Sequence, residues 1–171
     1  MILSKLPTTL DGREIPTDFR TWLKYGHIWE SSLLNTEKVR LTFKLILKTE
    51  PFEGYEDLGK WLNLFAWFYR CGKESRNSLP TRERVLDWAA DELTIWADFK
   101  MYAGIDLRSA RLHWWEFMAL FSSLPSHSQI KEIIGLRGMD LSEIKDPTMR
   151  QKYADAKAQV ALDCNKNDDW W

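Results

Sequence analysis

The sequence has few of the features that mark enzymes, secreted proteins or membrane proteins. Its two cysteines, Cys71 and Cys164, lie far apart and lack the spacing of a metal site. No apolar run is long enough to cross a membrane, and the N-terminus lacks the apolar stretch of a signal peptide. There is no internal repeat and no glycine-rich nucleotide-binding pattern. We therefore expect a cytoplasmic protein with free thiols, no cofactor and no membrane contact.

The sequence also has little net charge. The 24 basic and 25 acidic side chains nearly balance, so the protein has no overall field that attracts nucleic acid or anionic lipid. Nucleic-acid-binding proteins usually concentrate basic residues on one face, whereas here they occur as separate pairs with acidic residues between them. These pairs are Arg82 and Arg84, Arg108 and Arg111, and Lys131 and Arg137. We predict no nucleic-acid partner.

Catalytic and metal-binding patterns are also missing. No serine or cysteine lies in a recognisable nucleophile motif, and His27, His113 and His127 are scattered. His113 and Glu116 could form half of a carboxylate–histidine metal site in a helical bundle. Such a site needs further glutamates, and the usual order is Glu-x-x-His, so we expect both side chains to mark the polar edge of a helix. We predict no metal site, no catalytic residue and no enzymatic activity.

The unusual abundance in this sequence is tryptophan, with ten residues in 171. A large aromatic side chain can bury ~150–250 Å² of surface, and tryptophan also often dominates binding surfaces. The stretch Leu112 to Phe121 is apolar nearly all round a helical wheel, interrupted only by His113 and Glu116. Such a helix is either central to the core or covered by a partner. Each tryptophan can therefore be a core residue or a contact residue.

Hydrophobic spacing and capping residues predict an all-α fold: one domain over residues 1–171, a bundle of six to seven helices. Residues 1–17 are expected to be non-helical, with Asp11-Gly12 turning a short hairpin. Residues 165–171 are expected to form a flexible tail. The seven expected helices begin at residues 17–18, 35–36, 55, 82, 106, 126 and 146. One or two further helical turns are expected from residue 140.

The expected helix over residues 82–103 is the longest. Leu93 belongs to its predicted apolar stripe, with Val85, Ala89, Trp96 and Phe99. The spacing of its aspartates predicts a solvated face on this helix, formed by Asp87, Asp91 and Asp98. Together, the wide apolar arcs of the helices expected over 55–70, over 82–103 and from 106 onward supply more apolar surface than one core obviously needs. Part of that surface is expected to face another polypeptide.

Several stretches resemble the bacteriophage gene-product-fifteen family, found in tailed phages and prophages of Gram-positive bacteria. They are Leu6-Pro7, Asp11-Gly12, residues 17–20 (TDFR), 97–107 (ADFKMYAGIDL), 112–121 (LHWWEFMALF) and 133–137 (IIGLR). The genes of this family lie between those of the major tail protein and the tape-measure protein. The resemblance therefore implies a tail assembly chaperone that coats the tape-measure chain before the tail tube polymerises around it. It implies no catalytic residues.

On this interpretation the protein self-associates and binds the tape-measure protein in the host bacterial cytoplasm, and it is absent from the mature virion. Other tail proteins are possible further partners. The predicted contact residues are Trp61, Trp67, Trp88, Trp114, Trp115, Trp170 and Trp171. Two other functions remain open: a structural tail or connector protein retained in the virion, and a helical phage regulator that binds nucleic acid.

Overall fold

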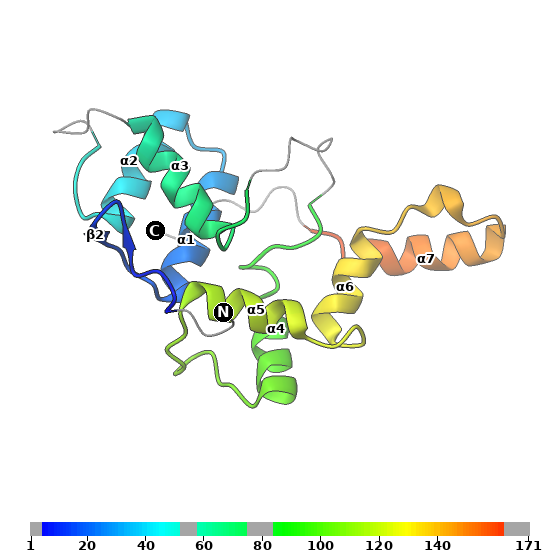
Figure 1. The fold of residues 1–171 in the computed structure, drawn as a ribbon. Helices are drawn as coiled ribbons and strands as arrows, with labels where there is room; N and C mark the ends of the chain where they lie inside the picture. The colour runs from blue at the N-terminus through cyan, green and yellow to red at the C-terminus, as the bar shows by residue number, and fades with distance from the viewer. Residues whose placement is uncertain (1–4, 52–57, 75–83, 163–171) are drawn as a thin grey trace. The chain divides into compact units, whose positions relative to one another are not determined.

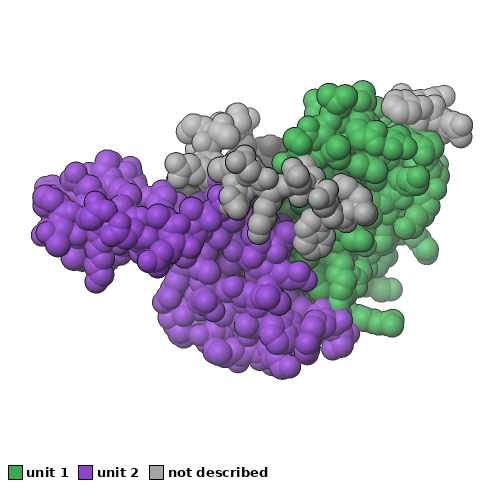
Figure 2. Space-filling model, turned by 180° about the vertical axis from the view of Figure 1, so that it is seen from behind, with its two compact units in different colours: residues 1–77, 111–119, 170–171 green, residues 78–110, 120–169 purple. Residues whose placement is uncertain are grey.

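The computed structural model describes residues 5–51, 58–74 and 84–162 (Figure 1). These residues form seven α-helices, two short helical segments and one two-stranded hairpin, which confirms the all-α prediction. The chain divides into two compact units (Figure 2): residues 1–77, 111–119 and 170–171 form unit 1, and residues 78–110 and 120–169 form unit 2. The single domain stays a prediction, and the expected tail 165–171 lies outside the described residues.

Unit 1 begins with the predicted hairpin. Strands β1 (Thr9–Leu10) and β2 (Arg13–Glu14) pair antiparallel, with Leu10 opposite Arg13. The two turn residues between them, Asp11 and Gly12, have φ values of 47° and 76°. This left-handed pair is the conformation that a tight two-residue hairpin turn requires, and Asp-Gly adopts it readily. The local sequence signal was therefore sufficient to specify this element.

The rest of unit 1 consists of three whole helices and the beginning of a fourth. They are α1 (Phe19–Glu30), α2 (Asn35–Ile46), α3 (Leu58–Tyr69) and the first residues of α5 (Trp114–Ser123). Asp18 caps α1 as predicted, because its carboxylate accepts the amide of Arg20 at 2.9 Å. The fully buried side chains of this unit are almost all aromatic or aliphatic: Trp22, Ile28, Phe43, Phe65, Phe68, Trp114 and Phe117, with Thr42.

Unit 2 contains the remaining elements. Helix α4 (Glu92–Asp98) continues into a π-helical segment, η1 (Phe99–Ala103); α6 (Gln129–Arg137), η2 (Leu141–Glu143) and α7 (Pro147–Gln159) follow. As predicted, Asp146 caps α7, accepting the amides of Thr148 and Met149. Figure 1 shows α7 lying against the segment that carries η2. None of the described helices has the length and apolar character that crossing a bilayer needs.

Two predicted helices begin later than expected. The helix expected from residue 82 begins at Glu92, and residues 84–91 form irregular chain followed by a turn. The helix expected from Asp106 begins at Trp114. The carboxylate of Asp106 accepts the amide of Arg108 at 3.1 Å, as a cap would, but residues 107–109 form only a turn. Trp96 and the Arg108 guanidinium also donate to this carboxylate. A third helix, expected to end at Gly135, runs through that glycine to Arg137.

The predicted solvated face of aspartates is wrong for two of its three members. Asp91 and Asp98 are each only 4% exposed. Asp98 accepts the amide of Ile130 at 2.8 Å, so it caps α6 from another helix. Asp91 pairs with Arg137 of α6. A buried carboxylate is stable only where donors surround it, and tertiary structure supplies those donors here.

Candidate partner-binding surfaces

Most of the tryptophan surface points inward. Of the ten tryptophans, Trp170 and Trp171 lie outside the described residues, and none of the other eight is in the exposed class. Trp22, Trp61 and Trp114 are buried; Trp29, Trp67, Trp88, Trp96 and Trp115 are half-buried. The candidates for partner contact among the described tryptophans are thus half-buried side chains, which expose only part of their rings.

Three of the predicted contact residues serve the cores of the two units. Trp114 stacks on Tyr69 with a centroid separation of 5.1 Å, and its Nε1 donates to the Tyr69 carbonyl at 2.8 Å. Trp61 is buried against Phe65 in unit 1. Trp88 belongs to unit 2, where it packs half-buried on Phe121. These contacts are ordinary aromatic packing, which stabilises the interior of each unit.

Trp67 of α3 and Trp115 of α5 are brought together at the surface of unit 1. Their rings meet edge-to-face, with centroids 5.5 Å apart. The Nε1 of Trp115 donates to the Phe68 carbonyl at 2.9 Å, which fixes that indole. The Nε1 of Trp67 has no acceptor among the described residues. We call these two side chains, together with Gly72 beside them, the Trp67–Trp115 surface.

Gly72 makes this arrangement possible. Just after α3, Cys71 and Gly72 are both in the left-handed region, at φ 55° and 76°. The Gly72 amide donates to the Trp67 carbonyl at 3.0 Å. A Cβ at position 72 would lie 3.0 Å from Cη2 of Trp115 and 3.4 Å from Cζ2 of Trp67. Only glycine provides both this backbone conformation and this space. Sequence analysis did not single out Gly72, although its place directly after a helix was a signal.

Burial also changes the pKa of the thiol of Cys71, the residue before Gly72. The side chain of Cys71 is half-buried, and this burial raises its pKa above the ordinary value, partly offset by the charge of Lys73. A thiol with a raised pKa is mostly protonated near neutral pH and reacts slowly. Cys71 therefore lacks the lowered pKa that marks an activated nucleophilic thiol.

His113 and Glu116 position Trp115 from the start of α5. The Glu116 carboxylate accepts the amide of His113 at 2.9 Å, and Nδ1 of His113 accepts the amide of Trp115 at 3.1 Å. This reciprocal pair is a capping box, with an imidazole in the place usually taken by a hydroxyl. Because Nδ1 accepts, Nε2 is the nitrogen that donates to the Pro7 carbonyl, at 2.9 Å. The expected polar edge is thus the helix cap.

The start of α5 is also tied to the start of α1. The amide of Phe19 donates to the Leu112 carbonyl at 3.1 Å, and the amide of Trp114 donates to the Thr17 carbonyl at 2.8 Å. The rings of Phe19 and Phe117 then stack at 4.7 Å. The position of Trp115 is therefore fixed by the backbone bonds at the start of α5, by the bond of its ring nitrogen to the Phe68 carbonyl and by the His113–Glu116 cap. No group of three His, Cys, Asp or Glu side chains suited to a metal ion occurs within the described residues.

A second candidate surface lies on unit 2. Leu93 of α4 and Met101 of η1 are 77% and 73% exposed, and Ala97 lies between them at the same spacing. The buried residues of this helix, Ile95, Asp98 and Phe99, lie between these exposed positions in sequence. We call Leu93, Ala97 and Met101 the α4–η1 face. The predicted burial of Leu93 is wrong, because the helix begins only one residue before it and its apolar stripe was assigned from a longer helix.

Both surfaces lie within a segment of the chain that matches a known family. The family model for the bacteriophage Gp15 protein matches residues 3–162. The chain belongs to the bacteriophage Gp15 family. No curated protein and no solved structure was found to match it. The family match spans both units of this Gp15 protein, including the Trp67–Trp115 surface and the α4–η1 face.

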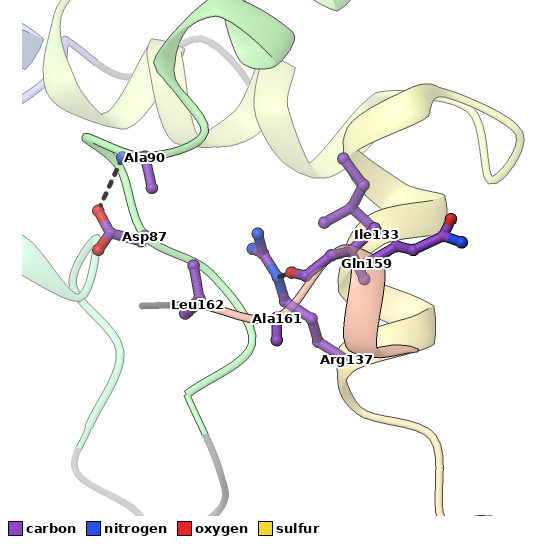
Figure 3. A pocket seen from close by; sticks show the side chains of 8 residues that line it. Asp87, Ala90, Ile133, Arg137, Gln159, Ala161 and Leu162 are labelled. Atoms are coloured by element: carbon purple, nitrogen blue, oxygen red, sulfur yellow. Dashed lines mark hydrogen bonds between the residues drawn. The ribbon is translucent and has the colours of Figure 1, made fainter. Parts of the chain in front are cut away.

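Unit 2 of the Gp15 protein also contains a cavity of about 340 Å³ (Figure 3). Its lining residues are Asp87, Ala90, Ile133, Arg137, Gln159, Val160, Ala161 and Leu162. The guanidinium of Arg137 is already engaged, with Asp91 and the carbonyls of Val85 and Val160. Asp87 accepts the amides of Ala89 and Ala90. The two charged side chains of the lining, Arg137 and Asp87, are therefore engaged in holding the fold together.

Proposed function

We propose that this protein is a tail assembly chaperone that binds the tape-measure protein while a siphophage-type tail is built. Membership of the Gp15 family supports a role in a phage. The observation that carries the proposal is the Trp67–Trp115 surface, where a half-buried indole keeps an N–H donor that no described residue accepts. A partner chain can cover this ring and supply the acceptor.

The geometry of this surface suits an energetically dominant contact. Tryptophan offers a large ring and one polar group with only two rotatable bonds, so little conformational entropy is lost on binding. Trp115 is held by its bond to the Phe68 carbonyl, and Gly72 leaves room for both rings. Such preorganised tryptophans commonly cost ≥ 2 kcal/mol of binding free energy when truncated.

The rest of the chain is compatible with many copies acting together. A tape-measure protein is long and helix-rich, so one chain can offer repeated sites to many chaperone molecules. Avidity along that chain allows each contact to be weak. The net charge of −1 means that copies gathered on one client repel each other little. Such a coat would keep apolar helices apart until the tail tube encloses them.

Co-expression with the tape-measure protein of the same phage tests this proposal. We expect the client to become soluble and to co-purify with the wild-type chain. Trp67→Ala should reduce the affinity by about 30-fold, the equivalent of ~2 kcal/mol. Trp67→Phe keeps an aromatic ring but removes the N–H, and should have an intermediate effect.

Leu34→Ala is the matched control, because Leu34 is an exposed apolar residue of unit 1 (77%) that is not one of the residues of the Trp67–Trp115 surface. If the wild-type chain neither solubilises nor retains the client, the chaperone proposal is wrong. If Trp67→Ala and Leu34→Ala behave alike, the surface is wrongly assigned. Mass spectrometry of purified virions tests the other phage role, because a structural tail protein would be present in stoichiometric amounts.

A further inference from the structure

The outward side of the α4–η1 helix carries an apolar stripe that no described residue of unit 2 covers. Leu93 and Met101 are among the most exposed large apolar residues in the described part of the chain. The same helix is anchored from behind by buried Ile95 and Phe99. The stripe therefore lies on a helix whose opposite side is packed. Its apolar surface is in contact with water, and covering it would be favourable.

The stripe is symmetric about Ala97. Leu93 lies four residues before this alanine and Met101 lies four residues after it. In a regular α-helix, positions four apart drift by about 40° around the axis. The wider π-helical turn of η1, residues 99–103, offsets part of that drift and keeps Met101 closer to the line of Leu93. A small residue at the centre also lets another helix cross closely.

Charged residues flank the stripe in a self-complementary order. Glu92 directly precedes Leu93, and Lys100 directly precedes Met101, so both lie on the same flank of the helix. Both side chains are exposed. Lys100 contacts Asp106 at 3.3 Å and lies over the ring of Trp96, while its side chain remains 53% exposed. An ammonium has three N–H donors, so Lys100 can donate to a second acidic side chain while it keeps its contact with Asp106.

From this pattern we infer that a second copy of this chain covers the α4–η1 face, with the two helices antiparallel about a two-fold axis at Ala97. In this arrangement Leu93 of each copy packs on Met101 of the other, and alanine meets alanine at the crossing. Glu92 of each copy faces Lys100 of the other, which forms two equivalent ion pairs. An interface of this kind uses the same surface patch on both subunits.

The contact is small, because one helix of twelve residues contributes it from each copy. Interfaces at the low end of the size range are weak and transient. We expect dissociation constants on the order of tens of micromolar. The inference deepens the proposed function by naming the surface for self-association, and it uses no residue of the Trp67–Trp115 surface.

Charge exchange provides the test, read by sedimentation velocity over a range of protein concentrations. The wild type should shift from monomer to dimer as concentration rises. Glu92→Lys and Lys100→Glu should each weaken the dimer at least tenfold, because each places like charges together twice. An equimolar mixture of these two variants should dimerise again, since every facing pair is then opposite in charge. The variant that carries both Glu92→Lys and Lys100→Glu should also dimerise, because its facing pairs are again opposite in charge.

Glu132→Lys is the matched control, because it makes the same charge change at an exposed position of α6. Circular dichroism should confirm that each variant is folded, including Lys100→Glu, which also loses its contact with Asp106. The inference is overturned if the wild type stays monomeric, if Glu132→Lys weakens the dimer as much as Glu92→Lys, or if the mixture fails to pair. A monomer that still binds the tape-measure protein would overturn only this inference. A dimer that does not bind it would overturn only the proposed function.

Discussion

The guanidinium of Arg137 donates hydrogen bonds to both carboxylate oxygens of Asp91, at 2.6 and 2.9 Å, although the two residues lie 46 positions apart. Both side chains are buried. Arg137 also donates to the carbonyls of Val85 and Val160. One side chain therefore joins α6 to the segment before α4 and to the end of α7, and accounts for four of the five guanidinium donors.

We predict that Arg137→Ala lowers the free energy of unfolding by about 3–5 kcal/mol, because it leaves Asp91 buried without its partner. Asp91→Asn should have a smaller effect of the same sign. Replacing both residues, with Arg137→Met and Asp91→Leu, should recover part of the loss. Urea unfolding followed by circular dichroism measures these changes. A cost below about 1 kcal/mol for Arg137→Ala would show that the pair does not anchor unit 2.

Gly26→Ala should destabilise unit 1 although alanine favours helices by about 1 kcal/mol. A Cβ at position 26 would overlap the phenol oxygen of Tyr69. Tyr69 cannot easily yield, because it stacks on Trp114 and packs on Tyr25. Overpacking of this kind costs about 1–3 kcal/mol. Thermal unfolding checks the prediction, and adding Tyr69→Phe to Gly26→Ala should relieve part of the cost.

Glu116→Ala should cost about 0.5–2 kcal/mol, the range for loss of a helix cap. Glu116→Gln should cost less, because its amide oxygen can still accept the amide of His113. The thermal midpoint of the wild type should be the same with added Zn²⁺ and with a chelator, since both side chains serve the cap. Differential scanning fluorimetry reads both effects. Stabilisation by Zn²⁺ that disappears in Glu116→Ala would contradict the capping role.

The pH dependence of stability should carry a contribution from Asp106. Hydrogen bonds from Arg108, Trp96 and Lys100 hold the pKa of this carboxyl well below its usual range. A lowered folded-state pKa stabilises the fold above the unfolded-state pKa, about 4. This contribution is lost as the pH falls from there through the lower folded-state pKa. Asp106→Asn should therefore have a lower free energy of unfolding than the wild type at pH 7. This difference in the free energy of unfolding should become smaller below pH 4. A gap that is constant from pH 7 to pH 2.5 would contradict this account.

Elements with strong local signals were predictable from the sequence. Asp11-Gly12 marked the hairpin, Asp18 marked the start of α1 and Asp146-Pro147 marked the start of α7. In each case the side chain acts on backbone groups within a few residues, or the backbone itself takes an unusual conformation. Neighbours in sequence are sufficient to determine such features.

Elements that depend on distant partners were not predictable. Asp106 accepts the amide of Arg108 as a helix cap would, but the chain after it forms only a turn, and its carboxylate also binds the indole of Trp96 ten residues away. Asp91 and Asp98 followed a solvated pattern, but Arg137 and the amide of Ile130 pair with them in the interior. The tryptophans were ambiguous for the same reason. Burial of Trp114 and partial exposure of Trp115 follow from tertiary packing, which adjacent positions in one helix do not reveal.

Amide hydrogen exchange of the full chain, with and without the tape-measure protein of the same phage, tests the central claim most directly. The account predicts slower exchange in the complex for residues 66–72 and 113–116, which carry the Trp67–Trp115 surface. The Trp67→Ala chain should show little of this protection at the same concentrations. Unchanged exchange in these residues, with the tape-measure protein present in excess, would contradict the account.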